Sequence, residues 1–98
     1  MNLRILATAI RDLESGRSFY DRQEMGVGDY FQDCLISEIE SLVLYAGIHR
    51  KVFGYHRMLS RRFPYAIYYT INGEILLVHR VLDCRRDPAW IKGELGGR

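Results

Sequence analysis

The feature that most constrains this chain is a pair of apolar stretches separated by an Asn-Gly dipeptide. Residues Tyr65–Ile71 are aromatic and β-branched, which are the types that suit a pleated sheet. A second apolar run occupies Glu74–Leu82. Asn72-Gly73 lies between the two runs and tolerates the positive φ angles of a type I′ turn. The stretch therefore predicts a β-hairpin with this dipeptide at its turn.

The N-terminal residues predict a short strand followed by a helix. Leu3–Leu6 is apolar and alternating, as in a strand, and the hydroxyl of Thr8 is placed to cap a helix over about Ala9–Glu24. Gly16 lies in the middle of this helix, where glycine costs about 1 kcal/mol relative to alanine. One bent helix and two short helices are therefore both acceptable.

A second helix is expected after the Met25–Gly28 break. Asp29 is a favourable cap residue, the helix continues to about Tyr45, and Gly47 closes it in the left-handed conformation. Its apolar residues follow helical spacing and form one stripe: Phe31, Leu35, Ile39, Leu42 and Ala46. The short link between the two helices favours an antiparallel helical hairpin.

The remaining elements are a strand before the hairpin and a helix after it. Alternation in His56–Arg61 places Arg57, Leu59 and Arg61 on one face of the strand, and Pro64 marks a bend. On the next strand Tyr65, Ile67, Tyr69 and Ile71 share the face expected to meet the helices.

Asp87-Pro88 is a typical helix start, and it predicts a short helix over Ala89–Leu95 with residues 96–98 frayed. Helices followed by strands indicate an α+β fold. The order is β-α-α-β-β-β with a short C-terminal helix, and a mainly antiparallel sheet packs on the N-terminal helical hairpin. We expect residues 1–98 to form one domain.

Composition narrows the classes of protein. A chain of 98 residues with 48% hydrophobic residues suits one small core. It has no apolar run near the roughly 20 residues of a membrane span and no secretory signal, which favours a cytoplasmic protein. Cys34 and Cys84 indicate reduced thiols. No metal site is expected, since Asp83 and Asp87 have no converging ligands, and no cofactor is expected either.

Charge is divided between the two halves of the sequence. Up to Gly47, four arginines face eight carboxylates, a net charge of −4; from Ile48, ten basic residues face four acidic ones, a net charge of +6. A positive half attracts polyanions such as nucleic acid, or an acidic partner segment. The alternative is a set of solvated arginines that keep strand edges from aggregating.

Several short sequences, in a shared order, resemble the RelE/ParE superfamily of toxins from bacterial type II toxin–antitoxin systems. They span the chain: Asp12-Leu13-Glu14 with Phe19-Tyr20, Gly26–Phe31, Ala46–His49, Arg61–Tyr69 and Val81–Pro88. The pattern is most similar to the ParE-like branch, usually labelled plasmid-stabilisation.

The resemblance implies a growth-inhibiting toxin that an antitoxin neutralises by wrapping it with an extended, often acidic segment. ParE-type members poison DNA gyrase, and RelE-type members cleave mRNA on the ribosome. We favour inhibition of the gyrase type. A ribosome-dependent mRNA endonuclease and an inactive, decayed toxin are the alternatives.

RelE-type catalysis needs basic residues on two strands and near the chain end, and commonly a terminal Tyr or His. The resemblance matches Arg57 to one strand position and Arg85 or Arg86 to the late one. A remodelled site would have Arg57, Arg61, His79 and Arg86 as catalytic candidates, with Arg80 near them. Three positions depart from that pattern, since Leu59 and Ala66 replace basic residues and Trp90 replaces the terminal acid. Arginine also rarely transfers protons, because its pKa exceeds about 12. These departures favour binding of a target without catalysis.

The candidate target-binding residues are all arginines: Arg57, Arg61, Arg62, Arg80, Arg85 and Arg86. We expect the antitoxin to shield Arg57, Arg61, Arg62 and Arg80. Arg85-Arg86 before the capped helix forms a cationic corner, which either grips a target or pairs with acids of the N-terminal helices. Tyr68-Tyr69 offers a weaker possibility of stacking on bases.

Overall fold

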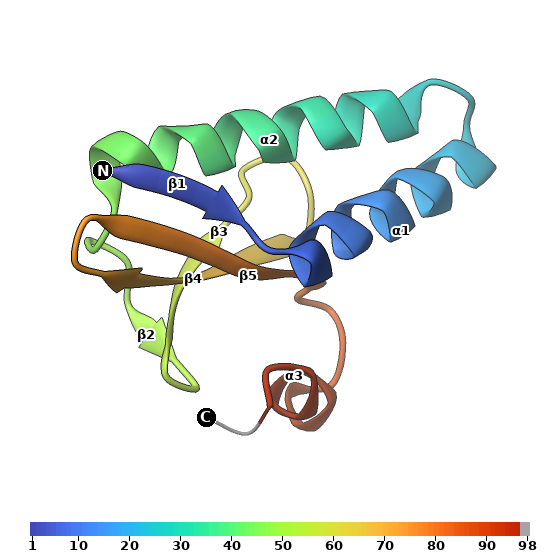
Figure 1. Cartoon of the computed structure of the whole chain (residues 1–98). Helices are drawn as coiled ribbons and strands as arrows, with labels where there is room; N and C mark the ends of the chain where they lie inside the picture. Colours follow the sequence, from blue (N-terminus) through green and yellow to red (C-terminus); the bar gives the residue numbers. More distant parts are fainter. Residues whose placement is uncertain (97–98) are drawn as a thin grey trace.

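A computed structural model describes residues 1–96 of the chain (Figure 1). Its elements are β1 (Asn2–Ile5), α1 (Ala7–Gln23), α2 (Val27–Tyr45), β2 (Lys51–Val52), β3 (Tyr55–Leu59), β4 (Tyr65–Asn72), β5 (Ile75–Asp83) and α3 (Pro88–Glu94). Gly97 and Arg98, for which fraying was expected, lie outside the described residues. None of the helices within residues 1–96 is long and apolar enough to cross a membrane.

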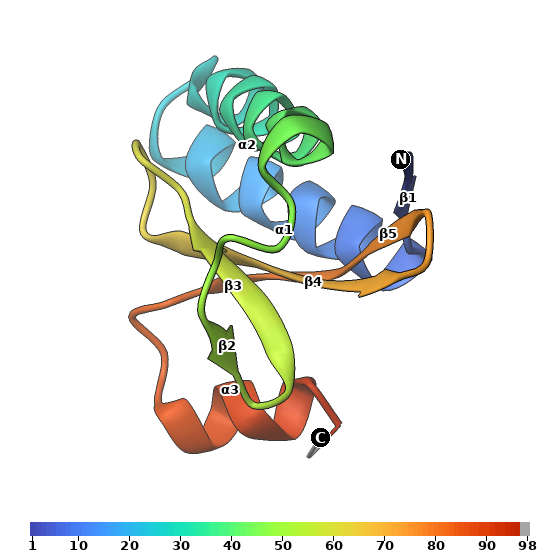
Figure 2. The ribbon, with the colours of Figure 1, turned by 90° about the vertical axis from the view of Figure 1, so that its left-hand side faces the viewer.

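The elements form three layers. One sheet has the strand order β1-β5-β4-β3-β2, in which β1 runs parallel to β5 and the other neighbours are antiparallel. The α1–α2 hairpin covers one face of the sheet, and α3 lies against the other (Figures 1 and 2). The predicted α+β fold is confirmed. The two-residue strand β2 was not predicted, because a run that short has no periodicity.

The predicted hairpin is β4–β5, but its turn differs from the expectation. Asn72 pairs with Ile75 inside the ladder, so Gly73 and Glu74 form the two-residue loop. Gly73 has φ 62°, whereas Glu74 is not among the residues of positive φ. A positive φ at the first loop position alone is the pattern of a type II′ turn, which selects Gly there. The prediction of a type I′ turn centred on Asn72 is therefore wrong by one residue.

Helix α1 is continuous through Gly16. This glycine is buried where α2 approaches α1 closely. A Cβ there would lie 2.5 Å from a ring carbon of Phe31, so the close packing of the two helices requires glycine at this position. The predicted cap at Thr8 is wrong. The helix begins after Leu6, and the Thr8 hydroxyl donates to the carbonyl of His79 at 2.7 Å.

Helix α2 also begins earlier than predicted. Gly26, with φ 92°, precedes its first residue, so Asp29 lies within the first turn and pairs with Arg17 at 2.6 Å. The predicted apolar stripe is confirmed, since Phe31, Leu35, Ile39 and Leu42 are fully buried. Gly47 has the expected left-handed conformation, φ 94°, one residue beyond the C-cap Ala46.

Each face of the sheet has its own hydrophobic core. Toward the helical hairpin, the α2 stripe packs on Tyr65, Ile67 and Tyr69, as alternation predicted. Toward α3, a smaller cluster contains Tyr55, Ala66, Tyr68, Leu82, Ile91 and Leu95. Tyr68 is 1% exposed and Tyr69 0%, so neither ring is accessible for stacking on bases. That prediction is wrong because α3 covers the face that a two-layer fold would expose.

Helix α3 begins as predicted. The carboxylate of Asp87 accepts from the backbone N–H of Ala89 at 2.9 Å, and Pro88 is the first helical residue. The Tyr55 hydroxyl then donates to the carbonyl of Leu95 at 3.0 Å and fixes the end of the helix on the sheet.

Candidate functional site

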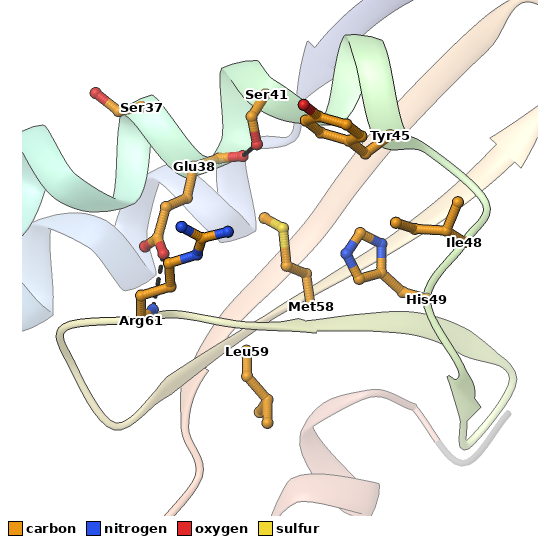
Figure 3. Close-up of a pocket in the computed structure, with 9 residues that line it drawn as sticks. All are labelled: Ser37, Glu38, Ser41, Tyr45, Ile48, His49, Met58, Leu59 and Arg61. Atoms are coloured by element: carbon orange, nitrogen blue, oxygen red, sulfur yellow. Dashed lines mark hydrogen bonds between the residues drawn. The ribbon is translucent and has the colours of Figure 1, made fainter.

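A groove of about 720 Å³ runs between α2 and β3 (Figure 3). Ser37, Ser41 and Tyr45 line it from successive turns of α2, because residues four apart lie on one helix face. Met58 points up from β3 toward this helix. Ile48 is 74% exposed at the far end. A smaller groove that includes Tyr30 and Arg62 shares Ser37, Glu38 and Arg61 with it, so the depression follows most of α2.

Glu38 fixes the near wall of this groove. Its carboxylate accepts from the hydroxyl of Ser60 at 2.7 Å and from the backbone N–H of Arg61 at 2.8 Å. These two bonds tie the β3–β4 loop to α2. The Arg61 guanidinium is left free to extend into the groove, as Figure 3 shows.

A cluster of three rings fixes the other end. The Tyr69 hydroxyl accepts from the backbone N–H of Gly47 at 3.0 Å and lies 2.5 Å from Nδ1 of His49. His56 stacks on Tyr69, with ring centroids 5.1 Å apart, and its Nδ1 donates to the carbonyl of His49 at 2.7 Å. Burial, and then the neighbouring His56, lower the pKa of His49. A neutral imidazole with no hydrogen on Nδ1 can accept a hydrogen bond from the Tyr69 hydroxyl.

A basic edge runs beside the groove along β2, β3 and the following loop. We use this name for Arg50, Lys51, Arg57, Arg61 and Arg62. None of these side chains forms an ion pair with a carboxylate in the part of the chain that the structure describes. Arg50 and Arg57 line a groove of about 330 Å³. Three predicted target-binding residues, Arg57, Arg61 and Arg62, belong to this edge.

Arg80 lies elsewhere and is held by carboxylates on both sides. Its guanidinium donates to Asp12 of α1 at 2.7 and 2.9 Å, and to the carboxylate of Glu94 at 3.0 Å. Asp12 also accepts from the backbone N–H of Val81 at 2.9 Å. The hydrogen bonds to Asp12 raise the pKa of Arg80 above its ordinary value. Arg80, which we expected the antitoxin to shield, is thus paired within the chain and joins α1 to the sheet and to α3.

The two arginines of the predicted cationic corner, Arg85 and Arg86, have different partners. Arg85 donates to Asp83 at 2.7 Å, and this hydrogen bond lowers the pKa of Asp83. The guanidinium of Arg86 instead lies 3.8 Å from the ring centroid of Trp90, a cation–π contact. Neither arginine forms an ion pair with acids of the N-terminal helices among the described residues. Arg86 and Trp90 line a groove of about 520 Å³ between α1 and α3.

The catalytic candidates do not share a groove. Arg57 lines the groove of the basic edge, Arg61 the α2–β3 groove and Arg86 the α1–α3 groove. His79 lies at an irregularity of β5 opposite the Tyr68–Tyr69 step, with Nε2 2.7 Å from the Thr70 hydroxyl. Proton transfer and charge stabilisation need groups that reach one reacting bond. Within residues 1–96 no cluster of three potential metal ligands is present either.

Some site residues had a signal that the sequence offered. Ser37, Ser41 and Tyr45 repeat at helical spacing on the side of α2 away from its core stripe, which identifies a second helix face. Glu38 and His49 had no comparable signal. Their roles depend on Ser60, Arg61 and Tyr69, which are distant in sequence.

Comparison with known proteins gives a match in structure alone. No protein-family model matches the chain, and no curated protein matches it. Nine chains of solved structures match. One comes from a structure titled "Chromosomal ParDE TA system from P. aeruginosa", with a TM-score of 0.74 and 19% sequence identity. The match covers 83% of this chain and 92% of that one. The chain therefore has a ParE-like fold, as its sequence resemblance predicted.

Proposed function

We propose that this protein is the toxin component of a type II toxin–antitoxin system. The observation that carries the proposal is the fold shared with a chain of a ParDE TA system over most of both chains. The whole-chain resemblance in sequence supports the same class. A toxin of this class inhibits growth when it is free and is silenced by its antitoxin.

The α2–β3 groove is the proposed antitoxin site. Its wall presents exposed apolar residues, Tyr45 at 54% and Ile48 at 74%, which would gain free energy when covered. The adjoining basic edge has five cations without ion-pair partners among residues 1–96, which suits an acidic segment. An amphipathic acidic segment would satisfy both surfaces at once. It would cover Arg57, Arg61 and Arg62, whereas the bidentate pair of Arg80 with Asp12 is already satisfied within the chain.

Binding of a gyrase-type target is favoured over mRNA cleavage. The separate positions of Arg57, His79 and Arg86 supply no acid and base for one bond. A protein that acts by occupying its target needs only surfaces. The proposed target is therefore a nucleic-acid-handling enzyme of the gyrase kind.

Induction of the chain alone in a bacterial host tests this function. We expect growth arrest with filamentation and DNA damage, while bulk mRNA stays intact. Coexpression of the small reading frame adjacent to its gene should restore growth. Rapid loss of translation with cut mRNA would identify the endonuclease instead. Normal growth with a folded, partner-binding protein would identify a decayed toxin.

Charge reversal tests the antitoxin site. Arg57→Glu combined with Arg61→Glu should weaken binding of the partner by about tenfold or more, because two attractive pairs become repulsive. Arg4→Glu combined with Arg11→Glu is the matched control, since both arginines are exposed and neither lines one of these grooves. If neither the double reversal nor 1 M salt changes the partner's affinity, electrostatic attraction at the basic edge contributes little to the free energy of binding.

A further inference from the structure

The groove between α1 and α3 exists because β1 ends early. β1 pairs with β5 only from Ile75 to Val78, so the last residues of β5 have β4 on one side and no strand on the other. Helix α1 crosses above this open edge and α3 lies below it, as Figures 1 and 2 show. The side chains of both helices and of β5 then enclose a groove of about 520 Å³.

The floor of this groove is rigid. Arg80 contacts Asp12 on α1 and Glu94 on α3, and its side chain is only 19% exposed. The three elements are thus fixed relative to one another before any ligand arrives, which lowers the entropic cost of binding.

The arginines around the groove fall into two kinds. Arg80 lines the groove and is paired with Asp12 and Glu94, whereas Arg85, which follows in the chain, is paired with Asp83. Arg22 and Arg86 also line the groove, yet neither forms an ion pair within residues 1–96. The guanidinium of Arg86 lies over the Trp90 ring, and its N–H groups have no carboxylate partner among residues 1–96, so they can donate to a bidentate acceptor.

The same groove has aromatic walls. Phe19 of α1 is 37% exposed, and Trp90 of α3 is half-buried. Two aromatic side chains beside free guanidinium groups form a surface that binds an apolar side chain next to a carboxylate.

We propose that this groove binds an acidic peptide segment of the target protein, with a carboxylate on Arg86 or Arg22 and an apolar side chain against Phe19 and Trp90. The inference rests on the proposed function and names where the target docks. Charge distinguishes this ligand from nucleic acid. Three arginines and three carboxylates line this groove, so its net charge is close to zero. A phosphate backbone suits the basic edge, where five cations are unpaired within the described part of the chain.

The single tryptophan of the chain makes the groove directly observable, because Trp90 is one of its walls. We would titrate the full chain with acetyl-Glu-Phe-Glu-amide and follow tryptophan fluorescence. Acetyl-Gln-Phe-Gln-amide is the matched neutral probe and a single-stranded oligothymidylate is the polyanionic one. The acidic peptide should give a saturable change, with the neutral peptide about tenfold weaker.

Two variants test the arginines independently. Arg86→Gln and Arg22→Gln should each weaken the acidic peptide by about fivefold to tenfold, while Arg11→Gln leaves it unchanged. Arg22 is exposed on α1, so its variant stays informative even if Arg86→Gln lowers the melting temperature. Equal affinity for the two peptides, or for the variants and the wild type, would overturn the proposal. So would a stronger response to the oligothymidylate that depends on the same arginines.

Growth arrest separates this inference from the proposed function. The Arg22→Gln/Arg86→Gln double variant should lose toxicity and keep its affinity for the antitoxin. If the wild type arrests growth and the double variant is equally toxic, the toxin function stands and the groove is not the target site. If the wild type does not arrest growth, the proposed function falls, and the peptide titration still decides whether the groove binds acidic segments.

Discussion

The two faces of the sheet are covered by helices in different ways. Toward the α1–α2 hairpin, the cover is a continuous apolar core with close aromatic contacts, such as Phe31 on Tyr65 at 4.8 Å between centroids. Toward α3, a seven-residue helix covers a small cluster and is held by polar bonds from Arg80 and Tyr55. The hairpin face thus buries the larger hydrophobic core. The α3 face buries a smaller one and leaves a groove lined by charged side chains.

Matched leucine truncations give the largest test of this contrast. Leu35→Ala on the hairpin face should cost about 4 kcal/mol, and Leu82→Ala on the α3 face about 2–3 kcal/mol, because the smaller cluster collapses more easily around a cavity. Both side chains are nearly fully buried in the native protein. Chemical denaturation measures both values. Equal costs would show that the two cores are equally well packed.

Loss of the ion pair between Arg80 and Asp12 should give the next largest effect. Asp12→Asn should cost about 2–3 kcal/mol, because it removes an ion pair that is 14–19% exposed and leaves the guanidinium poorly matched. Asp29→Asn removes a pair with Arg17 that is 46–65% exposed and should cost at most about 1 kcal/mol. Thermal melts of the two variants compare them directly. A similar loss in both would mean that the pair of Arg80 with Asp12 does not hold α1 to the sheet.

Alanine substitutions at two glycines, one in the hairpin and one in α3, should change the free energy of unfolding in opposite directions. Gly16→Ala should destabilise by about 1–3 kcal/mol, because the new methyl group meets the Phe31 ring. Gly93→Ala in α3 has no atom within 4 Å of the added Cβ and should stabilise by about 0.5–1 kcal/mol through helix propensity. Stabilisation by Gly16→Ala would show that the contact between α1 and α2 is loose.

The smallest effect concerns Asp83 and pH. Its pKa lies below the ordinary value of 3.8, chiefly because Arg85 donates to it, so the ionised form stabilises the fold. This contribution is present above the pKa of the unfolded state and is lost as pH falls through the lower folded value. The melting temperature of Asp83→Asn should therefore be below that of the wild type at neutral pH and converge with it in acid. A gap that persists in strong acid would argue against this ion pair.

Local sequence patterns predicted most of the elements, but they misplaced the N-terminal caps of α1 and α2. Helical spacing identified the α2 stripe, and Asp87-Pro88 identified the start of α3, because both depend on neighbours along the chain. The caps at Thr8 and Asp29 were mispredicted for one shared reason. Each side chain has a distant partner, His79 or Arg17, and that tertiary bond competes with local capping.

The candidate site was less predictable than the fold. The sequence predicted that the C-terminal half is positively charged and identified its arginines. It did not show which of these arginines form ion pairs within the chain. Arg80 was grouped with Arg57, yet the structure places Asp12 and Glu94 against Arg80. The burial of both Tyr68 and Tyr69 likewise depends on where α3 packs.

By itself, then, the sequence determined the order of helices and strands, the apolar face of each and the divided charge, because these depend on spacing along a few residues. Only the tertiary structure decided which cations remain available. Arg80 and Asp12 are 68 residues apart and meet because α1 crosses the open end of β5. Arg22 and Arg86, 64 positions apart in the sequence, line one groove for the same reason. Such pairings arise from packing in three dimensions, which no local pattern encodes.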